Sequence, residues 1–151
     1  MKKYELTDDT ITVGGRILHR IKALKSFSDV EEGDLGGYVE KEDNLDHSGE
    51  AWVSGNARVY GNARVSGDAR VSGDARVSGE NDYAAAKGFG REYRTTTFFR
   101  LQDGGIGVRC GCFCGTLEEF REKVKETHKE SKMGKEYLML ADLMEYKFKN
   151  A

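Results

Sequence analysis

Residues 51–80 read AWVSGNARVYGNARVSGDARVSGDARVSGE, and this stretch repeats with a period of six residues. Each unit has the pattern V-x-G-(N/D)-A-R. A period of six fits neither the 3.6-residue turn of an α-helix nor a simple array of hairpins. It suits one short strand plus one corner of a triangular solenoid. Three units would make one coil, so the stretch predicts a solenoid of stacked coils.

Small apolar residues occupy two phases of the repeat, and we expect them to fill the narrow interior of the coils. Gly followed by Asn or Asp would take the corners, where positive φ is needed. This arrangement is the hexapeptide signature of left-handed parallel β-helices, so the expected fold class is mainly β. The predicted repeat core consists of Val53, Val59, Val65, Val71, Val77, Ala57, Ala63, Ala69 and Ala75.

The register extends outward from the regular units, although it becomes irregular. Residues 35–40, LGGYVE, place Leu35 in the Val position and Val39 in the Ala position. The next two units depart from the pattern, with His47 in a Val position. We expect about three coils over residues 35–83. The open ends of such a short prism must be covered by the flanking segments or by another subunit.

The flanks predict a cap on one side and a separate module on the other. In residues 1–34, Gly14 and Gly15 separate two apolar stretches, which indicates a β-hairpin that caps the first coil. Residues 84–151 form the second flank. We expect it to begin with two strands joined by a turn at residues 103–105.

Two helices are expected to complete the C-terminal module. Thr116 and Glu119 form a capping box that opens the first helix. The second is expected over residues 131–148, and its apolar stripe is wider than one small helix pair would cover. We therefore predict a homo-oligomer, either a dimer or a trimer. The side chains that recur at helical spacing would form its interface: Tyr137, Leu140, Met144 and Phe148.

Composition argues against several classes of partner. The chain of 151 residues has 24 Lys and Arg against 26 Asp and Glu, a net charge of -2, which gives it no overall attraction to nucleic acid. Its apolar runs fall well short of the roughly 18 residues that span a bilayer. The start of the chain turns acidic where a signal peptide would be apolar. We expect a cytoplasmic protein that does not contact a membrane.

His47 and three cysteines are the candidate catalytic or metal-binding residues. His47 is the only histidine within the repeats, and we expect it to point into the interior in a structural role. Cys110, Cys112 and Cys114 alternate along an expected strand, whereas zinc sites favour the C-x-x-C spacing. We interpret the cysteines as buried small hydrophobes. The sequence thus predicts no catalytic residue, no metal and no cofactor.

Arginine recurs once per unit, at Arg58, Arg64, Arg70 and Arg76. A phosphate track would need uncompensated charge on one face, but the expected coil spreads these residues over three faces. Each would also have an acidic or aromatic neighbour in its column: Glu40 for Arg58 and Arg76, Asp46 and Asp82 for Arg64, and Trp52 for Arg70. We interpret them as structural columns and do not expect nucleic-acid binding.

Segments along nearly the whole chain resemble hypothetical hexapeptide-repeat proteins of tailed phages and prophages. Besides the array itself, these are LHRIKAL (18–24), GDLGGYVEKEDNL (33–45), GTLEEFREKVKETH (115–128) and KEYLMLADLMEY (135–146). The resemblance implies phage origin and, by analogy, action on a host protein such as a defence factor. The expected function is that of a non-enzymatic, self-associating binding protein. Two alternatives stay open: a hexapeptide acyltransferase and a structural component of the virion.

Overall fold

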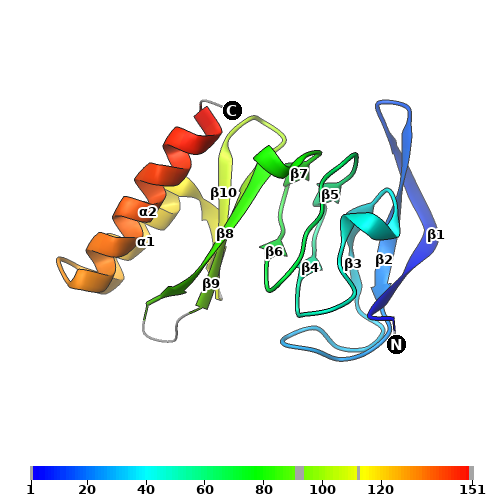
Figure 1. Ribbon diagram of the computed structural model, residues 1–151, viewed down its shortest axis with the longest axis horizontal. Coiled ribbons are helices and arrows are strands. Elements are labelled where there is room, and N and C mark those ends of the chain that lie inside the picture. Colours follow the sequence, from blue (N-terminus) through cyan, green and yellow to red (C-terminus); the bar gives the residue numbers. More distant parts are fainter. Residues whose placement is uncertain (1, 91–93, 112, 150–151) are drawn as a thin grey trace.

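The computed structural model describes residues 2–90, 94–111 and 113–149. The protein is mainly β, with two helices at its C-terminal end, as the sequence predicts. Figure 1 shows three parts in a row. An N-terminal hairpin lies at one end, the repeats lie in the middle, and a sheet covered by two helices lies at the other end.

The hairpin extends a sheet that continues into the repeats. β1 (Tyr4–Val13) and β2 (Arg16–Ala23) are antiparallel and are joined by Gly14-Gly15. Both glycines have positive φ, which a two-residue hairpin turn of this kind requires. β2 also pairs antiparallel with β3 (Leu35–Val39). The resulting five-stranded sheet has the order β1-β2-β3-β5-β7.

Short strands of the repeats pair in parallel with strands further along the chain. β4 (Trp52–Val53) pairs with β6 (Arg70–Val71), and β5 (Arg58–Val59) pairs with β7 (Arg76–Val77). In both pairs each residue lies beside the one that is three repeat units further along the chain. The period of the sequence therefore appears directly in the strand pairing.

The repeat interior is filled by the residues that the sequence marks for it. None of the nine predicted core residues is more than 2% exposed: Val53, Val59, Val65, Val71, Val77, Ala57, Ala63, Ala69 and Ala75. Four successive corners are made by glycines with φ between +63° and +66°: Gly55, Gly61, Gly67 and Gly73. A side chain at these corners would be strained, because L-residues rarely adopt this conformation.

The first, irregular units pair in a register that the sequence pattern did not predict. Val39 lies beside Val59 and Leu45 beside Val65, so the offset between paired residues is here two residues longer than three regular units. The two extra residues lie between Leu45 and Val53, a step that is longer than the regular step from one Val to the next. Leu35, expected in an interior position, is consequently 60% exposed.

A 3-10 turn lies at each end of the array. The turn η1 (Glu42–Asn44) follows β3, and η2 (Glu80–Asp82) leads into the C-terminal sheet. Among the described residues, the repeats pair in parallel at β3, β5 and β7, at β4 and β6, and at the bridge between Leu45 and Val65. The following strand, β8 (Tyr83–Phe89), leaves the array close to the residue where the sequence predicts its end.

The C-terminal sheet is antiparallel and has the order β11-β10-β9-β8. β9 (Arg94–Arg100) and β10 (Ile106–Cys110) are the two strands expected around the turn at residues 103–105. The sequence pattern missed β8, and it did not separate β11 (Phe113–Thr116) from β10. One face of the sheet packs on the repeats and the other on the helices, as Phe99 and Phe98 of β9 illustrate.

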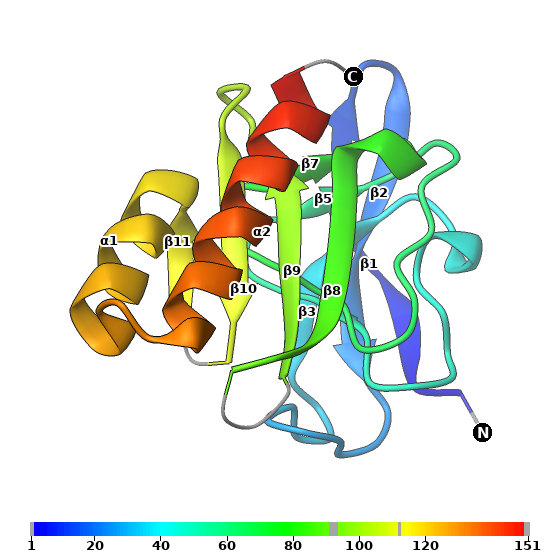
Figure 2. The same cartoon turned by 60° about the vertical axis from the view of Figure 1, so that its left-hand side comes forward.

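Two antiparallel helices cover the outer face of this sheet (Figure 2). α1 (Leu117–His128) begins with the predicted capping box, in which the Glu119 amide donates to Thr116 Oγ1 over 3.2 Å and the Thr116 amide donates to Glu119 Oε1 over 2.9 Å. α2 (Lys132–Lys149) follows after a short turn. Within the described residues, neither helix is long and apolar enough to cross a membrane.

Candidate functional site

His47 lies at the irregular end of the first coil. Its Nδ1 accepts a hydrogen bond from the Lys3 amide over 3.2 Å, so its Nε2 donates to the Glu42 carboxylate at 2.9 Å. Its ring stacks on Tyr4 at 4.2 Å, and 29% of its side chain is exposed. The prediction that His47 points into the interior is wrong, because the two extra residues shift this unit outward. The contacts place His47 in a structural role that holds the N-terminal strand.

Lys3 and Tyr4 close the same end of the array. The Lys3 ammonium is fully buried and donates to the carbonyl oxygen of Ala51 over 2.5 Å. Burial lowers the pKa of Lys3 to about 8, although the carboxylate of Asp46 acts in the opposite direction. The Tyr4 hydroxyl donates to the carbonyl of Leu45 over 2.6 Å. These bonds satisfy carbonyl groups in the irregular units that the regular ladder leaves free.

The two described cysteines do not share a strand, so the prediction of one alternating strand is wrong. Gly111 has φ +58°, and the chain turns there. Cys110 on β10 lies on the helix side of the sheet, 3.3 Å from the Thr96 hydroxyl. Cys114 on β11 is exposed and lies 3.3 Å from Ser72 of the repeats, so the interpretation of the cysteines as buried residues is wrong for Cys114. Cys112 lies outside the described residues. The described part of the chain has no cluster of His, Cys, Asp and Glu that could hold a metal ion.

The longer first coil rearranges the first arginine column. Tyr38, not Glu40, lies beside Arg58. Glu40 instead pairs with Arg16 of the hairpin at 2.9 Å. Tyr38 therefore takes the place expected for Glu40 beside Arg58, and Glu40 connects the hairpin to the repeats through its ion pair with Arg16.

The other arginine columns keep part of the expected pairing. Arg64 lies 3.9 Å from Asp46, as predicted, whereas Asp82 pairs with Arg100 of β9 at 3.0 Å. Arg70 does lie beside Trp52 in the strand pairing. Its guanidinium group, however, pairs with Asp29, which lies outside the repeats, instead of stacking on the indole ring.

The four residues predicted to form a subunit interface are buried within the chain. None is more than 8% exposed, and all pack against the C-terminal sheet: Tyr137, Leu140, Met144 and Phe148. The prediction is wrong because the sheet has four strands instead of two, and so covers this face of α2. The opposite face of α2 carries Met139, Leu143 and Tyr146, which are 57–70% exposed.

An apolar pocket of about 350 Å³ lies where α1 and α2 meet the ends of the strands. Aromatic rings form its walls. Phe120 contacts Tyr137 edge-on, with ring centroids 5.6 Å apart, and Phe113 lies 5.8 Å from Phe120. Val124 of α1 also lines the pocket and is 4% exposed. The lining suits an apolar group such as an aromatic ring.

Polar groups are few in this pocket, and most of them are donors or cations. The Tyr137 hydroxyl lies 3.8 Å from the sulfur of Cys110. Burial, followed by the neighbouring Cys110, raises the pKa of Tyr137, so its hydroxyl stays protonated at neutral pH. Arg94 of β9 and Lys123 and His128 of α1 also line the pocket, and Lys123 Nζ lies 3.8 Å from Glu126 Oε1. An acidic group would therefore be a favourable companion to the apolar group.

Comparison with known proteins identifies the repeats alone. A family model described as the YdcK beta solenoid repeat matches residues 51–67 and 57–71, which are regular units of the array. This segment is therefore similar to β-solenoid repeats, in agreement with the parallel pairing of strands that are three units apart. No curated protein matches the chain.

Sequence reasoning did not find the pocket. Its residues come from β8, β9, β10, β11, α1 and α2, and the pattern predicted neither β8 nor β11 as separate strands. One signal was present. Phe113 and Phe120 bracket the predicted capping box, and aromatic residues on both sides of a helix start favour contact between the strand and the helix.

Proposed function

We propose that this chain is a non-enzymatic binding protein in which a left-handed β-helix of about three coils holds a C-terminal binding module. The three-unit offset of the paired strands and the match to solenoid repeats support the β-helix. The hexapeptide pattern supports the left hand. One face of the module's sheet rests on the repeats, so the coils would fix its orientation.

The observation that carries the binding function is the apolar pocket beside α1. Its volume of about 350 Å³ lies within the range for ligand pockets, which bury an apolar body and orient it with a few polar groups. Lys123 and the Tyr137 hydroxyl can bind a carboxylate, while Phe113 and Phe120 surround an apolar side chain. We infer that the ligand is an aromatic side chain next to an acidic group on a partner protein.

The test uses 3-phenylpropanoate, which combines one aromatic ring with one carboxylate, and its uncharged amide. Calorimetry should give a dissociation constant of about 1 mM or tighter for the acid, as expected of a ligand with few heavy atoms. The amide should bind at least about fivefold more weakly, because it lacks the charge that Lys123 attracts.

Variants of α1 make the test specific. Lys123→Glu should abolish the preference for the acid, and Val124→Trp should fill the pocket and remove binding of both probes. Lys125→Glu is the matched control, because it makes the same change of charge on the same helix at a residue that does not line the pocket. If Lys123→Glu and Lys125→Glu bind the acid equally, or if Val124→Trp still binds it, the pocket is not the binding site.

The proposal includes self-association through the outer face of α2. Met139, Leu143 and Tyr146 follow the i, i+4, i+7 spacing of one helical face, and each is more than half exposed. A second copy of α2 is the occupant that this stripe fits, because a two-fold contact needs a self-complementary patch. For the partner that fills the pocket, the resemblance to phage proteins favours a host protein.

A further inference from the structure

The segment between β2 and β3 forms a small hairpin with an exposed carboxylate at its tip. Phe27 and Val30 exchange backbone hydrogen bonds of 2.9 and 2.8 Å across this tip, which consists of Ser28 and Asp29. Phe27 packs edge-on against Trp52 at 5.4 Å, and Val30 is 5% exposed. The base of the hairpin is therefore anchored to the core, while the tip projects beyond it.

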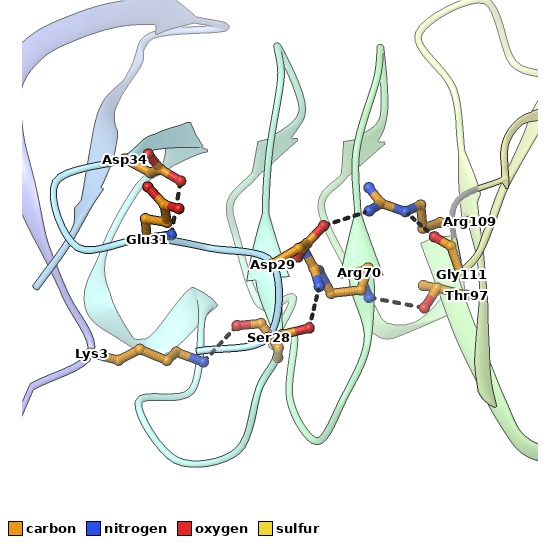
Figure 3. A network of polar contacts seen from close by, with 10 residues as sticks. Lys3, Ser28, Asp29, Glu31, Asp34, Arg70, Thr97, Arg109 and Gly111 are labelled. Atoms are coloured by element: carbon orange, nitrogen blue, oxygen red, sulfur yellow. Dashed lines mark hydrogen bonds and ion pairs between the residues drawn. The ribbon is translucent and has the colours of Figure 1, made fainter. Parts of the chain in front are cut away.

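The tip reaches two arginines from distant parts of the chain (Figure 3). One carboxylate oxygen of Asp29 lies 2.7 Å from Nη2 of Arg70 on β6, and the other lies 3.3 Å from Nη2 of Arg109 on β10. The two arginine side chains are 17% and 18% exposed, whereas that of Asp29 is 60% exposed. Two largely buried cations thus share one carboxylate that is mostly in water.

Each arginine also makes one hydrogen bond that does not involve the tip, through the backbone for Arg70 and through the side chain for Arg109. The backbone amide of Arg70 donates to Thr97 Oγ1 over 2.9 Å, and Arg109 Nε donates to the carbonyl of Gly111 over 2.9 Å. Together they line a cleft of about 410 Å³ between the hairpin tip, the repeats and the C-terminal sheet. The guanidinium group of Arg109 therefore has a partner that would remain if the tip moved away, whereas that of Arg70 donates to Ser28 and Asp29 on the tip itself.

The charges around the tip favour a ligand other than Asp29. The cleft is lined by four cations, Arg70, Arg94, Arg109 and Lys87, and by three carboxylates, Asp29, Glu50 and Asp68, so that two positive charges would be in excess if Asp29 moved away. The hydrogen bond from Arg70 holds the pKa of Asp29 below its usual value, so the carboxylate is ionised at neutral pH. Ser28 has φ +50°, a left-handed conformation that residues other than glycine rarely adopt. The tip is thus strained where it meets the arginines.

We propose that Arg70 and Arg109 form a binding site for the phosphate group of a small molecule, and that Asp29 occupies this site when the ligand is absent. Guanidinium groups bind phosphate oxygens in pairs, and a phosphate dianion matches the two positive charges. The site faces the repeats, whereas the apolar pocket lies on the helix side of β10. The inference therefore goes beyond the proposed function and does not depend on it.

The experiment is calorimetric titration with inorganic phosphate at pH 7.5 and constant ionic strength. Asp29→Asn should bind phosphate at least tenfold more tightly than the natural chain, because the competing carboxylate is gone. Asp34→Asn is the matched control. Asp34 is exposed on the same segment and accepts a hydrogen bond from the Glu31 amide, away from the arginines. The Asp34→Asn variant should therefore bind phosphate with the same affinity as the natural chain.

Three further arms complete the test. In the Asp29→Asn background, Arg109→Lys keeps the positive charge but loses the forked geometry, and should weaken binding at least tenfold. Circular dichroism of each variant checks that the fold is intact. Failure of Asp29→Asn to bind phosphate, or equal affinities of the Asp29→Asn and Asp34→Asn variants, would overturn the proposal. Tighter binding of malonate than of phosphate to Asp29→Asn would overturn the choice of phosphate.

Discussion

The ammonium group of Lys3 is buried against the first repeat units. Its burial can be measured, because it makes the free energy of unfolding depend on pH. Burial lowers the pKa of Lys3 from 10.5 to about 8, and the side chain is fully buried. The unfolded chain keeps the ordinary pKa. Between these two pH values the unfolded state therefore holds a proton that the folded state has released. The free energy of unfolding must rise with pH across this window, and the gain is lost as the pH falls through the pKa of the folded state.

The size of the effect follows from the two pKa values. Each pKa unit corresponds to about 1.4 kcal/mol, so the charged Lys3 destabilises the fold by about 3 kcal/mol at pH 7. The same relation gives about 2 kcal/mol at pH 9 and about 1 kcal/mol at pH 10. The destabilisation of the fold by Lys3 should thus decrease by about 2 kcal/mol between pH 7 and pH 10.

Urea unfolding of the natural chain and of Lys3→Met, at several pH values from 7 to 10, measures this contribution. The difference between their free energies of unfolding removes the titration of all other groups. The free energy of unfolding of the natural chain should rise relative to that of Lys3→Met as the pH rises. Lys2→Met is the control, because Lys2 has a side chain that is 64% exposed and pairs with Glu42. Parallel curves for the natural chain and Lys3→Met would refute the burial of a charged Lys3.

Three further predictions concern the repeats and α2. Val65→Ala should lower the free energy of unfolding by about 2 kcal/mol in chemical denaturation, because it leaves a cavity in the repeat interior; a loss below about 0.5 kcal/mol would contradict close packing. Gly61→Ala should cost more than Gly73→Ala, since both have φ above +60° but only at Gly61 would the new methyl group meet a carbonyl oxygen, that of Ser78, at 2.7 Å; equal losses would argue against this contact. Leu143→Glu should convert an oligomer to a monomer in light scattering, and a mass of 16.9 kDa for the natural chain at about 10 µM would rule out self-association.

The sequence predicted those features that depend on short-range repetition. Val65 and Ala63 are buried because the period of six returns the same two phases to the interior of the repeats. Gly61 takes a corner because that corner needs positive φ. The capping box at Thr116 needs only residues three apart. Each of these features is decided within one unit or one helical turn, so one sequence is enough to find it.

Features that depend on where distant segments meet were not predictable from the pattern. The two extra residues before Val53 change the register in which the first units pair. From the sequence of these irregular units alone, a loop and a change of register are equally compatible with the two residues. Leu140 was expected at a subunit interface because its apolar stripe was visible but the strand that covers it was not. The pairing of Asp29 with Arg109 joins residues 80 positions apart, and no local signal marks it.

Insertion of whole and partial coils tests most directly whether the repeats form coils of three units that hold the C-terminal module. A second copy of residues 53–70 placed after Arg70 adds three units, keeps every column in phase, and separates the ends by one further sheet spacing of about 4.8 Å. A second copy of residues 53–58 placed after Arg58 adds one unit and rotates everything downstream by one side of the coil. The urea midpoint of the whole-coil insertion should equal or exceed that of the natural chain, and that of the one-unit insertion should be clearly lower. Equal midpoints for the two insertions would contradict the coil.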